Sequence, residues 1–382
     1  MKGLMSFEVD KVIKKRSALG AALAIVIILL GIFYIGFHYS HLGLVNRNNT
    51  SKGAENIYWE KVQKFEGSFS NQKIESILSD FIDDYQRFKP EDRPFDLYSS
   101  NIADIFFSKD QDDIYLRMNE AIDKGEKINI TDIKLNKIED VGFSSSYSNL
   151  KIGSYITWSD LYKVHGAVFI LSVVVCIVIC SDSFSGDTSK NIESLLKTTK
   201  YGRLLLPRIK IIVATFLSMS ILWLLEIITF AVFFLYNKGL SGWDASIQTN
   251  FLLKQFAFSS QINQLQILGI QIVLYSFAII FISSLSLVVS AISQTSTLSL
   301  IAATSLFILP MGLIKIFREG LINAILYIFP VNNYTINNIL AIFSNKNIVF
   351  PFSFEGNIIL ICLIFTVFAL LNNVIICKKI KR

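Results

Sequence analysis

Residues 164–236 read VHGAVFILSVVVCIVICSDSFSGDTSKNIESLLKTTKYGRLLLPRIKIIVATFLSMSILWLLEIITFAVFFLY. Two long apolar runs, 164–181 and 211–236, flank a polar segment, and the second run contains a single charge, Glu226. An apolar run of about 20 residues is long enough to cross the hydrocarbon core of a bilayer as a helix. We therefore predict two membrane spans joined by a short loop at 182–210.

The rest of the chain repeats this pattern. It has 52% hydrophobic residues, and its mean hydropathy of +0.49 is too high for an ordinary soluble globule. No charged residue occurs in 255–314, which is too long for one span and is divided by the polar cluster 293–297. The further predicted spans are 17–37, 265–292, 298–314 and 357–377. Six spans place both termini on the same side of the membrane.

Lysine and arginine residues predict which side that is. Five lie in the N-terminal segment 1–16, six in the loop 182–210 and four in the tail 378–382. The opposite loops, 237–263 and 315–356, carry two and three. Because short cytoplasmic loops are rich in Lys and Arg, we expect cytoplasmic termini. The Cys-poor, Ile/Lys/Asn/Phe-rich composition suggests a Gram-positive bacterium, so we expect a multi-pass protein of the bacterial plasma membrane.

The segment 38–163 is then extracytoplasmic. It holds 21 acidic and 16 basic residues, a net charge of −5, whereas the rest of the chain carries +11. The formal net charge of +6 is thus a sign of membrane topology and gives no reason to expect a nucleic-acid partner. The segment contains no cysteine, which excludes a disulfide framework within it.

Apolar residues at helical spacing predict that this insertion is mainly helical, with helices over 71–88 and 110–124. Residues 128–138 fit a strand as well as a helix, which leaves an α+β insertion open. The predicted fold is an all-α polytopic membrane protein with six transmembrane helices and this insertion between spans one and two. Residues 1–16 predict an amphipathic helix on the inner surface, and the short apolar pieces in 315–356 predict re-entrant or interfacial helices.

The loop 182–210 has its own pattern. Apolar and small side chains recur at helical spacing and predict one short amphipathic helix; they are Phe184, Thr188, Ile192, Leu195, Leu196 and Thr199. Asp187 lies in its first turn, and Glu193 and Lys197 are spaced for a helical ion pair. Gly202 lies where a helix can end.

These features resemble the cytoplasmic coupling loop of type-2 ABC exporter permeases. An acidic start, a leucine pair and the element Lys200-Tyr201-Gly202-Arg203 carry the resemblance, together with Thr157-Trp158-Ser159-Asp160-Leu161 before the second span. This chain has Thr157 where Gram-positive members usually have Gly, and Asp187 where Glu is commoner. The resemblance implies that a separate ATPase subunit contacts this loop through Phe184, Asp187, Ile192, Glu193, Leu195, Leu196, Tyr201, Gly202 and Arg203.

The same resemblance implies the other partners. Such permeases work in pairs, as homodimers or heterodimers, in the lipid bilayer. The chain contains no G-x-x-x-x-G-K-[ST] sequence, so ATP and Mg²⁺ would be bound by the ATPase subunit and no cofactor by this chain. No G-x-S-x-G, H-E-x-x-H or C-x-x-C sequence occurs either, and an enzymatic function has no residues to support it. His38 and His41 are a weak metal candidate, and we expect no metal site.

Glu226 is the most unusual single residue. It lies sixteen residues from Lys210, about 24 Å along a helix, and therefore near the middle of the bilayer. A carboxylate at that depth normally faces a cavity or a polar partner. It either contacts substrate or ions in a translocation path, or is a buried acid hydrogen-bonded by groups such as Ser218, Ser276 or Ser283.

The predicted function is the permease subunit of an ATP-driven exporter. One alternative is an ion- or proton-coupled carrier that uses Glu226 and no ATPase. Another is a membrane sensor or anchor whose outer domain binds a ligand without transport. For the loop, the alternative is an interfacial helix that has no partner.

Overall fold

The computed structural model describes residues 2–14, 16–43, 53–88, 93, 95–107, 111–143, 149–199, 202, 205–344 and 351–381. The chain forms two compact units. We call the first, Met1–Ile32, Val164–Ala231 and Gly269–Arg382, the bundle unit. The second, Phe33–Lys163 and Val232–Leu268, is the insertion unit.

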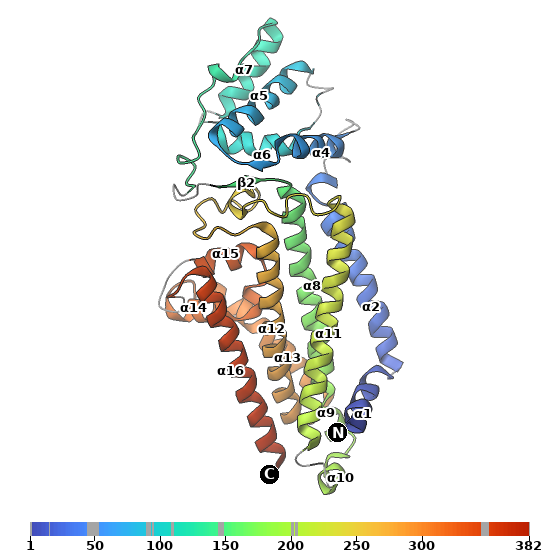
Figure 1. The fold of residues 1–382 in the computed structure, drawn as a ribbon. Coiled ribbons are helices and arrows are strands. Elements are labelled where there is room, and N and C mark those ends of the chain that lie inside the picture. Colours follow the sequence, from blue (N-terminus) through green and yellow to red (C-terminus); the bar gives the residue numbers. More distant parts are fainter. Residues whose placement is uncertain are drawn as a thin grey trace. The chain divides into compact units, whose positions relative to one another are not determined.

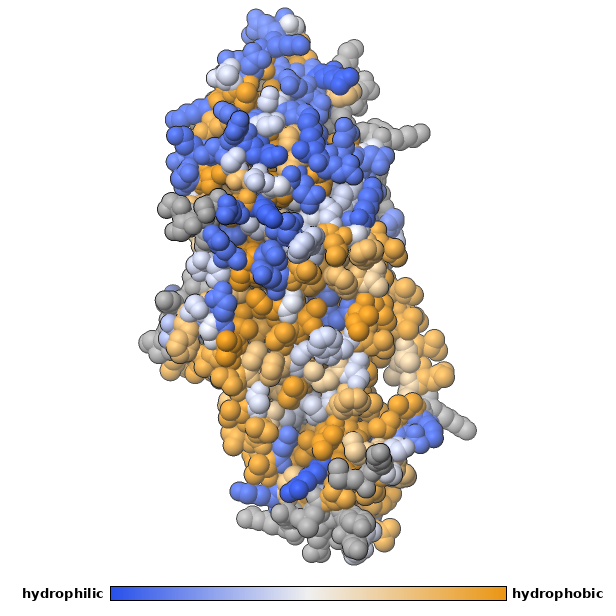
Figure 2. All heavy atoms as spheres, viewed as in Figure 1, coloured by the Kyte–Doolittle hydropathy of each residue, from blue (hydrophilic) through white to orange (hydrophobic). Residues whose placement is uncertain are grey.

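Six of the described helices are long and apolar enough to cross a membrane. They are α2 (Arg16–Phe33, continued by the π-helix η1, Tyr34–His38), α8 (Tyr155–Asp182), α11 (Leu205–Tyr236), α12 (Gln264–Ile292), α13 (Ser296–Ile316) and α16 (Phe354–Lys381) (Figure 1). Figure 2 shows hydrophobic side chains over α2, α11 and α16, and hydrophilic ones over α5 and α7 of the insertion unit. The prediction of an all-α polytopic membrane protein is confirmed.

The bundle unit also contains short helices. They are α1 (Lys2–Ile13), α9 (Ser185–Thr188), α10 (Glu193–Thr198), α14 (Gly320–Ile328), the 3-10 helix η4 (Pro330–Asn332) and α15 (Ile336–Ser344). Asn332 donates hydrogen bonds from Nδ2 to the carbonyls of Pro310 (3.2 Å) and Leu326 (2.9 Å), which fixes this region on α13. Pro310 lies inside α13, and the helix continues to Ile316.

Within the described part of the insertion unit, four α-helices lie wholly inside it: α4 (Ala54–Phe65), α5 (Asn71–Arg87), α6 (Leu97–Phe106) and α7 (Gln111–Lys124). Ser70 caps α5, because its Oγ accepts a hydrogen bond from the Lys73 amide. The strands β1 (Gly67–Ser68) and β2 (Lys151–Ile152) pair antiparallel and are only two residues long. Residues 128–138, left open by the sequence, contain a 3-10 helix, η2 (Ile130–Asp132), and one bridge from Leu135 to Phe107.

The loop 237–263 folds as part of the insertion unit. It contains the 3-10 helix η3 (Ile247–Thr249), and the Thr249 hydroxyl donates a 2.7 Å hydrogen bond to the carbonyl of Lys151. Thr157, where the resembled family usually has glycine, hydrogen-bonds the Asn237 side chain through its hydroxyl. The helix α8 begins at Tyr155, earlier than the predicted start of the span at 164.

Candidate functional site

The predicted coupling loop, 182–210, is not one helix. The segment from Ser185 forms the short helix α9, which ends at Thr188, and α10 begins at Glu193. Asn191 lies between them with φ 55°, a left-handed conformation that interrupts a right-handed helix and that Asn tolerates better than most residues. The prediction of one continuous amphipathic helix is therefore wrong, and its apolar stripe is divided into two parts.

The first part is buried in the bundle unit. The side chain of Phe184 is buried, and the amides of Phe184 and Ser185 both donate to the Ser290 hydroxyl of α12 at 3.1 Å. Ser290 in turn donates to the carbonyl of Ser181 at 2.8 Å. The Ser290 hydroxyl thus hydrogen-bonds a carbonyl at the end of α8 and two amides at the start of α9. Phe184 packs inside the unit.

Asp187 is also buried, within a cluster of four charged side chains. It accepts a hydrogen bond from Lys11 Nζ of α1 at 2.5 Å and forms an ion pair with Lys210 of α11. Lys210 Nζ lies 3.7 Å from Glu8 Oε2 and donates to the carbonyl of Ser183 at 2.6 Å. Two acids and two bases balance in charge, which is the condition for burying them together.

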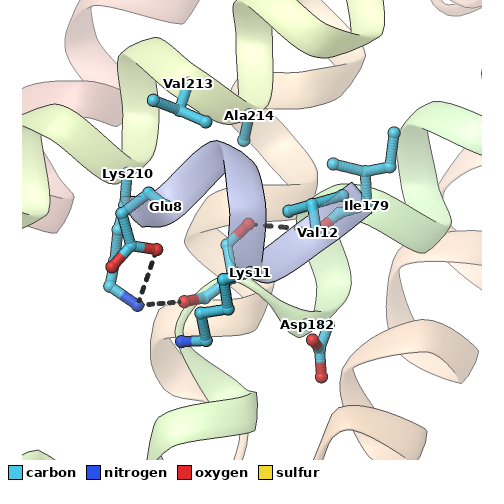
Figure 3. Close-up of a pocket in the computed structure, with 9 residues that line it drawn as sticks. Glu8, Lys11, Val12, Ile179, Asp182, Lys210, Val213 and Ala214 are labelled. Atoms are coloured by element: carbon cyan, nitrogen blue, oxygen red, sulfur yellow. Dashed lines mark hydrogen bonds and ion pairs between the residues drawn. The ribbon is translucent and has the colours of Figure 1, made fainter. Parts of the chain in front are cut away.

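Figure 3 shows the cavity beside this cluster, with Glu8 and Lys210 joined by an ion pair. Its volume of about 20 Å³ is room for one water molecule, and α1, the end of α8 and the start of α11 line it. Burial alone lowers the pKa of Lys11, but the hydrogen bond to Asp187 and the charges of Asp187 and Glu8 outweigh it and raise the pKa above its ordinary value. Lys11 is therefore a cation at every physiological pH.

The second part of the loop is exposed. Leu195 of α10 is 66% exposed and Ile192 is exposed beside it, whereas Leu196 lines a cavity of about 40 Å³ with Phe184, Gly202 and Leu206. A Cβ on Gly202 would lie 1.7 Å from the carbonyl oxygen of Leu196, so only glycine fits there. Tyr201, Arg203 and the side chains of Glu193 and Lys197 lie outside the described residues.

Glu226 of α11 is buried at 2% exposure, and its partner is His165 of α8, which is 0% exposed. Glu226 Oε2 contacts His165 Nδ1 directly. Neither His165 Nε2 nor Glu226 Oε1 has a hydrogen-bond partner in the described part of the chain. The acid and the imidazole thus hold α8 and α11 together deep within the bundle unit.

The hydroxyls that the sequence suggested for Glu226 serve their own helices. Ser218, Ser276 and Ser283 donate to the carbonyls of Ala214, Ile272 and Ile280, respectively. His165 was missed because it lies at the start of an apolar run and 61 residues from Glu226 in sequence. One signal was present: in two successive apolar runs, 164–181 and 211–236, His165 is the one histidine or charged residue of the first and Glu226 that of the second.

His41 lies near a carboxylate that the sequence did not place there. Its Nδ1 is 3.6 Å from Asp160 Oδ1, and Lys163 Nζ lies 3.8 Å from the same oxygen. Within the described ranges, no three His, Cys, Asp or Glu side chains gather as metal ligands. Asp160 thus pairs with Lys163 and also lies beside the His41 imidazole.

Six apolar spanning helices, with a helical insertion between the first two, define a multi-pass membrane protein with a polar segment anchored between spans two and three. The sequence profile of the ABC-2 family transporter protein matches residues 4–368, and the chain belongs to this family. It is a permease of an ABC transporter, a class of membrane components that are generally not enzymes and that typically work with an ATPase subunit. Comparison with curated proteins and with solved structures gave no match.

Proposed function

We propose that this chain is the permease subunit of an ATP-driven exporter in the bacterial plasma membrane, with both termini in the cytoplasm. A separate ATPase subunit binds ATP and Mg²⁺, and two permease subunits, identical or different, form the pathway. The family assignment supports the ATPase partner, and the chain itself has no phosphate-binding G-x-x-x-x-G-K-[ST] sequence.

The segment 182–210 is the contact with the ATPase in this proposal. The observation that carries it is the division of the segment into an anchored part and an exposed part. Phe184 and Asp187 are internal anchors of the permease, whereas Ile192 and Leu195 present apolar side chains to a partner. A short exposed apolar helix on an anchored loop fits a groove on another protein, because desolvated apolar anchors supply most of the energy of such contacts.

The test is the substitution Leu195→Asp. A charge buried in an apolar groove should weaken ATPase binding by roughly 2–4 kcal/mol. Lys190→Ala, at an exposed position of the same segment, should change it little. The measurement is pull-down of the ATPase that copurifies with the wild-type chain, with size-exclusion chromatography of each permease variant as the control for folding. Retention of the ATPase by Leu195→Asp at the wild-type level would exclude 182–210 as the contact.

A further inference from the structure

Two helices carry the segment 182–210: α8 ends at Asp182 and α11 begins at Leu205. Any displacement of this segment by an ATPase reaches the membrane through these helices, so the inference below rests on the proposed function. The question is whether α8 and α11 move separately or together.

One charged link joins them at the segment itself. Lys210 in the first part of α11 pairs with Asp187 in the continuation of α8, and it donates to the carbonyl of Ser183 at 2.6 Å. Lys210 and Asp187 are both buried. This link fixes the start of α11 on the turn that follows α8.

The second charged link is the His165–Glu226 pair. Glu226 is sixteen residues beyond Lys210 in α11, so the two links are about 24 Å apart along that helix. In the described part of the bundle unit, the ion pairs between spanning segments are these two: one joins α8 to α11, and the other joins α9, which follows α8, to α11. By contrast, α11 contacts α12 through a neutral hydroxyl pair, Thr215 and Ser283, at 3.3 Å.

The chemistry of the pair makes it a firm link. An imidazole nitrogen and a carboxyl oxygen in direct contact can form a hydrogen bond with the proton on either atom. The hydrogen bond therefore persists in both forms, and it is strengthened by the low dielectric of its surroundings. Water does not compete for it, because both side chains are almost fully buried.

We propose that His165 and Glu226 are positioning residues that lock α8 and α11 into one lever, so that a push on 182–210 moves both helices together. Tyr275 of α12 is a further titratable group that interacts electrostatically with Glu226. Its hydroxyl accepts from Gln271 Nε2 at 2.6 Å and donates to the carbonyl of Tyr334. The lock thus belongs to α8 and α11, and α12 contributes only neutral groups beside it.

The test measures distances between spin labels in the permease–ATPase complex in lipid nanodiscs, without nucleotide and with ATP plus vanadate. Labels at Val174 and Phe216, exposed positions of α8 and α11, report on the lever. Labels at Phe216 and Val367 report on α11 relative to α16. We expect the second distance to shift with nucleotide and the first to stay constant.

Three variants examine the lock. The double substitution His165→Leu/Glu226→Leu should still insert and fold, because apolar residues usually replace a buried ion pair without loss of stability. We expect it to make the α8–α11 distance depend on nucleotide. His165→Glu/Glu226→His, which restores the pair in reverse, should return the constant distance. Thr229→Val removes a hydroxyl one turn from Glu226 that donates a 2.8 Å hydrogen bond to the Leu225 carbonyl of the same helix, and it should behave as wild type.

The outcomes separate the two claims. If neither distance responds to nucleotide, the proposed ATP coupling fails and this inference fails with it. If the α11–α16 distance responds and the wild-type α8–α11 distance shifts as much, the coupling stands and the lever does not. A constant α8–α11 distance in the double leucine variant would show that these two residues are not the lock.

Discussion

Lys61 of α4 is only 6% exposed, and three carboxylates of the insertion unit surround its ammonium group. It forms ion pairs with Asp80 and Asp84 of α5, the latter at 2.5 Å, and lies 3.7 Å from Asp96 Oδ2 before α6. One cation thus compensates acids from two neighbouring helices. Without it, the same acids would repel one another across a partly buried junction.

Lys61→Met should therefore loosen the insertion unit. The loss of a largely buried partner, discounted for the partial exposure of Asp80 and Asp84, should cost roughly 2–4 kcal/mol. A cysteine at Ser99, which is 0% exposed on α6, reports on opening of this unit in the full-length chain. Its labelling by a thiol reagent should become ~30- to 900-fold faster in the Lys61→Met background.

Lys64 supplies the matched control. It also pairs with Asp80, but its side chain is 53% exposed, and such a pair contributes about 0–1 kcal/mol. Lys64→Met should therefore change the labelling of the Ser99 cysteine at most several-fold. If the two substitutions accelerated labelling equally, the burial of Lys61 would add nothing to the stability of the insertion unit.

The pKa of Lys61 also predicts that the insertion unit loses stability at alkaline pH. Burial alone lowers its pKa, but the hydrogen bonds to Asp80 and Asp84 and the charge of Asp96 outweigh this and raise the pKa from 10.5 to about 12. The stabilisation is fully present below pH 10.5, the pKa in the unfolded chain, and is lost as pH rises through about 12. The ratio of Ser99-cysteine labelling rates between Lys61→Met and wild type should fall towards one across this range, and a constant ratio would contradict the assignment.

At the scale of single residues, the sequence identified Glu226 as unusual but did not identify His165 as its partner. A single acid in an apolar run is visible without any structure, which is why Glu226 was predicted to matter. His165 is visible too, but the sequence does not say that α8 turns this residue towards α11, because both helices are apolar around most of their circumference. The prediction that serine hydroxyls bind Glu226 was wrong for a physical reason: a hydroxyl in an apolar helix usually donates to the backbone of its own helix one turn earlier.

At the scale of elements, a helix within 182–210 was predicted, but its interruption between α9 and α10 was not, and α4 and α6 of the insertion were not predicted either. Periodicity alone favours continuing a helix through Asn191, because an uncharged polar side chain between the apolar positions does not disturb their helical spacing. The break depends on tertiary bonds: Ser290 holds the start of α9 and Lys210 holds Asp187. These anchors lie 23 or more residues away in sequence, where local patterns carry no information.

Gly202 gives an element-scale prediction. Gly202→Ala places a Cβ against the carbonyl of Leu196, so α10 must shift away from the cavity that Leu196 lines. We expect at least a tenfold loss of ATPase binding in the pull-down, with insertion into the membrane unchanged. Gly20→Ala, in the span α2 with nothing within 4 Å of the added Cβ, is the control and should bind normally. Binding by Gly202→Ala equal to that of Gly20→Ala would mean that the position of α10 is unimportant for the partner.

At the scale of the whole molecule, the sequence predicted the six spans and the insertion but not the composition of the insertion unit. Hydropathy locates apolar runs reliably, because length and the absence of charge suffice. It treated 237–263 as a connecting loop, whereas Asn250 Nδ2 donates to the carbonyl of Tyr155 at 3.2 Å and the Gly242 amide donates to Glu66 at 3.0 Å. Such polar pairings between distant segments leave no periodic signal.

The last prediction concerns topology. The excess of Lys and Arg in 1–16, 182–210 and 378–382 predicts that these segments are cytoplasmic and that the insertion is extracytoplasmic. A cysteine at Lys124, whose side chain is 64% exposed on α7, should react with a membrane-impermeant maleimide in intact cells. A cysteine at Ser189, exposed after α9, should react only after the cells are permeabilised. The four native cysteines are replaced beforehand, and labelling of both sites in permeabilised cells controls for their accessibility. Labelling of the Ser189 position in intact cells would reverse the orientation and remove the ATPase contact from 182–210.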